Sequence, residues 1–235
     1  MRDQKRVSRV AGVAKRGTSL MRLPRINLTN RVEFIERYAR GKRVLHVGCA
    51  DVPFTLDRLT RGELLHQRLH GCAAELHGVD LSEEGIGIMR SAGFKDLFVA
   101  DCEKPLSHST PGGYDVVIAG ETLEHVLNAG DFLSALKSAC GPNGRIILTT
   151  PNHASLKINL RLLSGVELVH PEHVAYYSYS TLSRLLNMAG LEPMDWALYW
   201  AEKSKKSQVV NSALRRMPAL NYFADGICVA CRSIP

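Results

Sequence analysis

The stretch that decides the fold is Val44-Leu45-His46-Val47-Gly48-Cys49-Ala50, in which a mostly apolar run ends at a glycine. Such a run is typical of a buried strand followed by a tight turn. Leucines then recur at helical spacing between residues 56 and 71. The segment therefore predicts a strand over residues 43–49, a turn, and one helix that ends at Gly71.

The same alternation continues along the chain. Asn30 and Ser82 are side chains that cap helices, and Gly141-Pro142-Asn143-Gly144 is a strong turn signal. Because strands alternate with helices, we predict an α/β fold, namely a Rossmann-like, doubly wound, mostly parallel seven-stranded sheet with helices on both faces. The expected strands are residues 43–49, 76–80, 96–101, 114–120, 145–150, 194–200 and 223–231.

The residues after the first strand distinguish between nucleotide-binding folds. From Gly48 the chain reads Gly-Cys-Ala-Asp-Val-Pro, which is not the G-x-G-x-x-G of dinucleotide folds, and no G-x-x-x-x-G-K-[ST] phosphate loop occurs. Carboxylates stand where the next two strands end, at Asp80 and Asp101, and Tyr114-Asp115-Val116-Val117 opens the fourth strand. A carboxylate at a strand end can accept hydrogen bonds from ribose hydroxyls.

These four motifs, in this order, resemble the class I S-adenosylmethionine-dependent methyltransferases over roughly residues 43–200. The resemblance implies S-adenosylmethionine as cofactor, with Asp80 near the ribose and Asp101 near the adenine amino group. The implied cofactor residues are His46, Gly48, Ala50, Asp80, Leu81, Asp101, Cys102, Gly120 and Glu121.

The turn departs from the family pattern. His46 stands where the family usually has an acid, and Ala50 and Val52 stand where it usually has glycines. The methyl group of Ala50 would crowd backbone that approaches the ligand, which predicts a weaker affinity. Asp51 is the candidate replacement for the missing carboxylate.

The sequence Glu121-Thr122-Leu123-Glu124-His125 follows the fourth strand. In one helical turn, positions i, i+3 and i+4 share a face, and carboxylates with an imidazole suit Mg²⁺ or Mn²⁺. The motif is similar to the metal-binding motif of ubiquinone-pathway O-methyltransferases and small-RNA 2′-O-methyltransferases. The candidate metal ligands are Glu121, Glu124, His125 and, from His170-Pro171-Glu172-His173, His173. The alternative is metal-free general base catalysis by His125 or His173.

The acceptor is predicted to be an oxygen of a small molecule, because the family's N-P-P-Y motif for amino groups is absent after the fourth strand. Candidates are a phenol, a quinone precursor or a sugar of a glycolipid, polysaccharide or natural product. Residues 153–178 interrupt the alternation where relatives place substrate-covering insertions. Two other functions stay open: an RNA 2′-O-methyltransferase, and a partner protein that keeps the fold without catalysis.

The net positive charge is concentrated at the beginning of the chain. Residues 1–30 contain eight Lys or Arg and one acid, whereas the rest contains 22 basic and 22 acidic residues. We expect residues 1–28 to form a basic, flexible tail before a single domain at 29–235; contact of the tail with RNA or anionic lipid and a transit peptide are the alternatives. No apolar run is long enough to span a membrane, and the six scattered cysteines suit a reducing compartment, so we predict a cytoplasmic protein.

Overall fold

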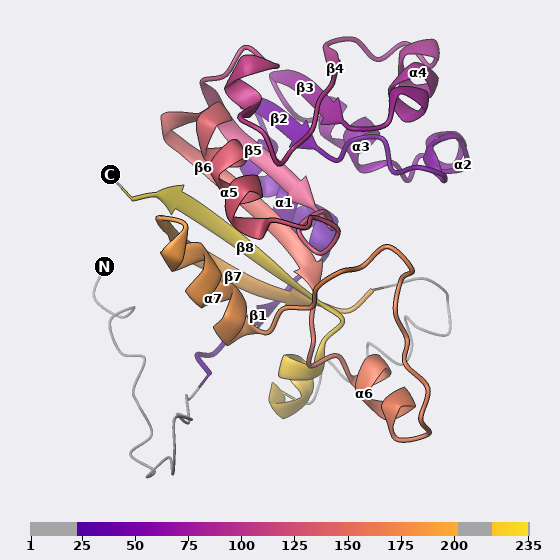
Figure 1. The fold of residues 1–235 in the computed structure, drawn as a ribbon, viewed down its shortest axis with the longest axis vertical. Coiled ribbons are helices and arrows are strands. Elements are labelled where there is room, and N and C mark those ends of the chain that lie inside the picture. Colours follow the sequence, from indigo (N-terminus) through magenta and orange to yellow (C-terminus); the bar gives the residue numbers. More distant parts are fainter. Residues whose placement is uncertain (1–22, 202–217, 235) are drawn as a thin grey trace.

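The structure is a computed structural model that describes residues 23–201 and 218–234. Its centre is an eight-stranded sheet with the strand order β1-β7-β8-β6-β5-β2-β3-β4 (Figure 1). The strands are β1 (Asn27–Leu28), β2 (Arg43–Val47), β3 (Glu75–Asp80), β4 (Leu97–Val99), β5 (Tyr114–Gly120), β6 (Cys140–Pro151), β7 (Leu191–Tyr199) and β8 (Gly226–Ser233). All neighbours are parallel except β8, which is antiparallel to β6 and β7.

The predicted doubly wound, mostly parallel α/β fold is therefore confirmed, with one strand more than expected. The extra strand is β1, which lies in the predicted tail and pairs with β7 through Asn27 and Leu28. The part of the tail before residue 23 lies outside the described residues.

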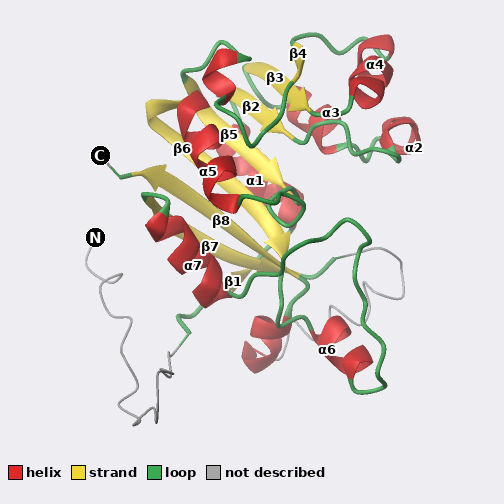
Figure 2. Ribbon diagram, in the orientation of Figure 1, coloured by secondary structure: helices red, strands yellow, loops and turns green. Residues whose placement is uncertain are grey.

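Helices cover both faces of the sheet, as Figure 2 shows. Alternate residues of a strand point to opposite faces, so Val117 and Ala119 of β5 pack with α5 (Ala129–Ala139) and α7 (Tyr179–Met188). Val116 and Ile118 face the other side, where they pack with α1 (Arg31–Ala39) and α3 (Leu65–His70). Cys228 and Cys231 of β8 lie in these two opposite cores, because residues three apart on a strand point to opposite faces.

The predicted helix starts are confirmed by their hydrogen bonds. The Asn30 side chain accepts from the backbone N–H groups of Val32 and Glu33 and begins α1. The Ser82 hydroxyl accepts from the N–H of Gly85 and begins α4 (Glu83–Ser91). Both caps satisfy N–H groups that a helix cannot pair internally.

Two local predictions are wrong. The expected helix between residues 56 and 71 is broken into α2 (Thr55–Arg61) and α3, because Gly62 between them has a left-handed φ of 70° and ends α2. The expected turn at residues 141–144 is part of β6, which begins at Cys140 and pairs with Tyr114 before a shift in register. Residues 141–144 themselves have no partner in β5, because Tyr114 pairs with Cys140 and Val116 with Arg145, so they form a bulge within the strand at the place of the expected turn.

The predicted insertion, residues 153–178, lies beyond the carboxyl end of β6 (Figure 1). It contains α6 (Leu156–Leu162), none of whose residues is buried, and a longer segment without regular structure before α7. Along the described chain, every helix is too short or too polar to cross a membrane.

Candidate functional site

The candidate site lies where the strand order reverses. The chain runs outward from β2 to β3 and β4, and then returns to β5 on the other side of β2. Val47 pairs in register with Val79 of β3 and Ala119 of β5, so these three strands end at one level. The fold thereby brings together Gly48, Asp80 and Gly120 at the edge where doubly wound sheets bind their ligands.

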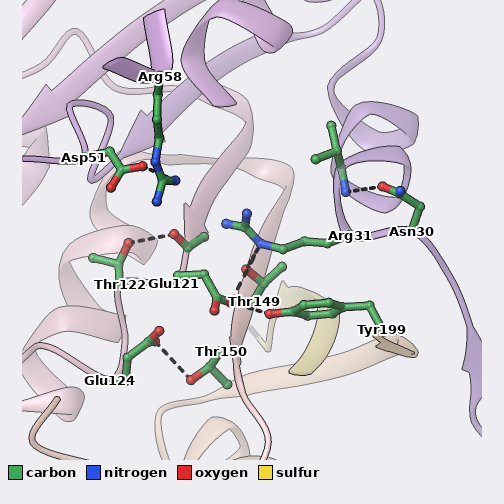
Figure 3. A network of polar contacts seen from close by, with 12 residues as sticks. Asn30, Arg31, Asp51, Arg58, Glu121, Thr122, Glu124, Thr149, Thr150 and Tyr199 are labelled. Carbon is green, nitrogen blue, oxygen red and sulfur yellow. Dashed lines mark hydrogen bonds and ion pairs between the residues drawn. The ribbon is translucent and has the colours of Figure 1, made fainter. Parts of the chain in front are cut away.

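Three residues at this edge have left-handed backbone conformations. Gly48 has a φ of 71°, and a Cβ atom there would lie 2.8 Å from Oγ1 of Thr122. Asp51 (φ 58°) and Glu121 (φ 57°) adopt this conformation although they are not glycines, and Asp51 forms an ion pair with Arg58 (Figure 3). Such residues cost of the order of 1–3 kcal/mol each and cluster at functional sites.

Ala50 packs against a helix, and its effect on cofactor affinity stays a prediction. Its side chain is fully buried and points to α4, where a Cβ atom on Gly85 would lie 2.6 Å from the Ala50 methyl and 2.6 Å from Cγ2 of Val52. The turn thus has alanine where the family usually has glycine, and the helix that packs against it has glycine at the point of contact.

The carboxylates predicted at the strand ends hold the surrounding backbone. Asp80 accepts the N–H of Ala50 at 2.9 Å with one oxygen and the N–H of Ser82 at 3.0 Å with the other. Asp101 accepts the N–H of Glu103 at 2.9 Å, and this bond, followed by that to the Lys104 side chain, lowers its pKa. Both carboxylates keep further lone pairs for a ligand.

Apolar side chains are exposed beside these carboxylates. They follow the ends of β2 to β5 and are Val52 (37% exposed), Leu81 (70%), Val99 (40%) and Leu127 (86%). Cys102 is partly buried, and burial raises its thiol pKa to about 12, so the thiol is neutral at pH 7. Exposed apolar groups flanking polar atoms suit a flat, partly polar ligand such as a purine ring.

His46 contacts another part of the molecule. Its ring is buried, stacks on His66 of α3, and places Nδ1 3.3 Å from Nδ1 of His66. Burial lowers the pKa of His46 well below its ordinary value and that of His66 to about 3, so both rings are neutral at pH 7. The structure gives His46 a partner in α3, and a direct role in cofactor binding stays a prediction.

Arg31 is part of the site, although nothing in its sequence context predicts this. Its Nε atom donates to Oγ1 of Thr149 at 2.9 Å and lies 3.7 Å from Oε1 of Glu121, which also accepts from the Tyr199 hydroxyl at 2.8 Å (Figure 3). A Cβ atom on Gly120 would lie 2.6 Å from a guanidinium nitrogen of Arg31. The sequence shows only that Arg31 begins a helix, because the direction of its side chain depends on β5 and β6.

The predicted helical turn at residues 121–125 is wrong. The segment is a turn without helix, since Glu121 has a positive φ and the N–H of His125 bonds to the carbonyl of Thr122. Glu121 therefore faces Arg31, whereas Glu124 points into the protein, where it accepts from the Thr150 hydroxyl at 3.0 Å. The two carboxylates and the imidazole do not share a face.

Glu124 is fully buried, and Oε1 of its carboxylate has no hydrogen-bond partner among the described residues. Burial, and then the charge of Glu121, raise its pKa. Its backbone carbonyl accepts the N–H of Val174 at 2.9 Å and that of Ala175 at 3.3 Å. This tether holds the insertion against the turn after β5.

The tether brings three histidines together. The ring centroid of His173 lies 4.7 Å from that of His125 and 5.1 Å from that of His170, and His125 and His170 are 5.6 Å apart. Burial lowers the pKa values of His125 and His173. The predicted catalytic pair, His125 and His173, is thus assembled, whereas the metal ligands expected at Glu121 and Glu124 are outside the group of potential ligand atoms.

Known proteins match most of this chain. A family model described as a methyltransferase domain matches residues 21–195. The ubiquinone biosynthesis O-methyltransferase of Burkholderia lata is 30% identical over 145 residues, which are 59% of this chain and 57% of that protein. The protein of the same name from Burkholderia pseudomallei is 26% identical over 178 residues, 70% of this chain and 72% of that protein.

Solved structures share the fold. A SAM dependent methyltransferase from Archaeoglobus fulgidus superposes with a TM-score of 0.56 at 19% identity, covering 86% of this chain and 90% of that one. Magnesium protoporphyrin IX methyltransferase from Synechocystis with bound SAH gives a TM-score of 0.56 at 16% identity, covering 85% and 80%.

Proposed function

Because the chain belongs to the class I S-adenosylmethionine-dependent methyltransferases, we propose that it transfers the methyl group of S-adenosylmethionine to an oxygen of a small molecule. One observation carries the proposal: Gly48, Asp80 and Gly120 meet at the reversal of strand order, and the turn that follows Gly120 carries His125, whose ring lies 4.7 Å from that of His173. The O-methyltransferase names of the Burkholderia relatives support oxygen as the acceptor atom.

The residues at the site fit the methyl donor. Asp80 would accept hydrogen bonds from the two ribose hydroxyls, and Asp101 would accept from the adenine amino group. Leu81 and Leu127 would cover the adenine ring, since both side chains are exposed, Leu81 follows Asp80, and the N–H of Leu127 donates to Glu103, two residues after Asp101. Arg31 would pair with the carboxylate of the methionine portion. When bound, S-adenosylmethionine supplies a methyl group that is already activated by the positive sulfur.

The protein's own part of the reaction is to align the acceptor and to take its proton. His125 and His173 are suited to this, because burial keeps their imidazoles neutral at pH 7, and a neutral imidazole accepts a proton. Glu172, whose Oε2 lies 3.9 Å from Nδ1 of His125, would stabilise the imidazolium that forms.

The insertion supports an acceptor with an apolar part, such as a phenol or a quinone precursor. It exposes several aliphatic side chains that follow one another closely: Leu160, Leu162, Leu163, Val166, Leu168 and Val169. Exposed apolar side chains in such density are typical of binding surfaces.

The expected site for Mg²⁺ or Mn²⁺ does not fit the residues present. Glu121 is bonded to Tyr199 and Glu124 to Thr150, and neither belongs to the histidine group. We therefore assign no step to an ion held by these carboxylates.

The test is methyl transfer from labelled donor to a panel of phenols, quinone precursors, sugars and RNA. His125→Ala and His173→Ala should lower turnover by about 10²- to 10⁴-fold, because a proton acceptor is lost, while S-adenosylhomocysteine still binds. Turnover equal to that of the wild type would contradict the roles of His125 and His173 as proton acceptors. No detectable binding of S-adenosylmethionine at millimolar concentration would instead favour a partner protein without catalysis.

The RNA alternative rests on the basic residues before position 29, most of which lie outside the described residues. It requires binding that weakens steeply with salt and that is lost when residues 1–28 are removed. A flat response to salt would rule against it.

A further inference from the structure

His125, His170 and His173 form a compact group at the turn after β5. One potential ligand nitrogen of each lies within 4.8 Å of the other two. The group joins two distant segments, the turn after β5 and the insertion, and the hydrogen bonds from Val174 and Ala175 to the Glu124 carbonyl fix their relative position. His170 is exposed, so the group can be reached from solvent.

We propose that these three histidines form a binding site for a divalent transition metal of the Zn²⁺ or Co²⁺ type. Imidazole nitrogen is a preferred ligand of these ions, whereas Mg²⁺ prefers oxygen ligands. In a tetrahedral site with metal–nitrogen distances near 2.1 Å, nitrogens are about 3.4 Å apart. The three rings therefore need to close by about 1.4 Å at most, which small side-chain rotations provide.

The surroundings of the group suit metal ligation. Nδ1 of His173 is buried and has no hydrogen-bond partner among the described residues, which is a costly state for a polar atom. Glu172 lies beside Nδ1 of His125 and can orient that ring through its carboxylate. The N–H of Glu172 donates to Nδ1 of His170 at 3.3 Å. This hydrogen bond must break if His170 binds the metal through Nδ1.

This metal site would serve the proposed methyl transfer, so its role rests on the proposed function. Three protein ligands leave a fourth position open, and an oxygen of the acceptor is the group that would fill it. In the metal-free protein His125 or His173 would take the proton of the acceptor as proposed above, and with an ion bound the same residues would hold the ion, which would lower the pKa of the acceptor hydroxyl. Because His170 completes the ligand set, the site differs from the one expected from Glu121 and Glu124.

The experiment titrates metal-free full-length protein, without a polyhistidine tag, with Co²⁺ and follows the visible absorption of the ion. The wild type should bind one Co²⁺ per chain, and His170→Ala should weaken binding by at least about 100-fold, beyond the 10- to 100-fold typical of an outer ligand partner. The matched control is His153→Ala, an exposed histidine of the same insertion outside the group, which should bind as the wild type does.

Two further measurements make the result decisive. His173→Ala should also abolish binding, and excess Mg²⁺ should not displace Co²⁺. The proposal is overturned if the wild type binds no Co²⁺, if His170→Ala binds it as tightly as the wild type, or if Mg²⁺ displaces it readily. Calorimetry with S-adenosylhomocysteine distinguishes failure of the metal site from failure of the proposed function. If this ligand binds but Co²⁺ does not, only the metal site is overturned.

Discussion

The packing of Ala50 on Gly85 explains how the chain tolerates alanine in its cofactor turn, and Gly85→Ala tests this directly. The added Cβ atom would lie 2.6 Å from the Ala50 methyl and from Cγ2 of Val52. Carbon atoms in contact are normally about 3.5–4.0 Å apart, so the turn and α4 must separate by about 1 Å. We expect the substitution to move the turn and to weaken binding of S-adenosylhomocysteine.

The magnitude follows from two opposing terms. Overpacking costs about 1–3 kcal/mol, while alanine gains up to about 1 kcal/mol over glycine in a helix. Gly87→Ala is the matched control, because it makes the same change in the same helix at a site where nothing lies within 4 Å of the new atom. In urea unfolding, Gly85→Ala should be less stable than Gly87→Ala by about 1–3 kcal/mol.

A double-mutant cycle identifies the partner. Ala50→Gly removes one of the two close contacts, so it should offset part of the loss caused by Gly85→Ala, and the two effects should differ from additivity by more than about 0.5 kcal/mol. If Gly85→Ala unfolds at the same urea concentration as Gly87→Ala, or if the two effects add, the Ala50 methyl does not occupy the space below the turn.

Three further outcomes are expected. His46 and His66 are held neutral, with folded pKa values below the unfolded value of 6.5, so the folded state binds fewer protons than the unfolded state and stability falls as the pH drops below 6.5. Below this pH each ring lowers the free energy of unfolding by about 1.4 kcal/mol per pH unit. In urea unfolding between pH 6.5 and 5, His66→Gln should remove about half of the pH dependence that the two rings cause, and an unchanged pH dependence would contradict the buried pair. Gly48→Ala should lower thermal stability and S-adenosylhomocysteine affinity together, because it places a methyl group 2.8 Å from Thr122 at a φ of 71°, and wild-type values for both would be inconsistent with the turn described. Asp80→Asn should weaken S-adenosylhomocysteine about 10- to 100-fold in calorimetry, as a hydrogen bond to a charged group contributes about 1.5–3 kcal/mol, whereas an unaltered affinity would remove Asp80 from the ribose site.

The architecture and the sheet edge that carries the candidate site could be predicted from local patterns of residues. Alternating apolar strands and capped helices predict the doubly wound sheet, and the caps at Asn30 and Ser82 form as expected. The sequence also placed Gly48, Asp80 and Gly120 at strand ends, and parallel strands of one sheet necessarily present such ends at one edge. These features follow from local patterns, because a strand or a helix start needs only neighbouring residues to specify it.

The directions of the side chains at the site could not be predicted, because they depend on contacts between distant segments. Ala50 faces Gly85, His46 faces His66, and the guanidinium of Arg31 reaches Thr149, although 118 residues separate the last pair along the chain. The same holds for the histidine group, whose members come from the turn after β5 and from the insertion. These contacts depend on close packing between segments that are distant in sequence, which no local pattern of residues encodes.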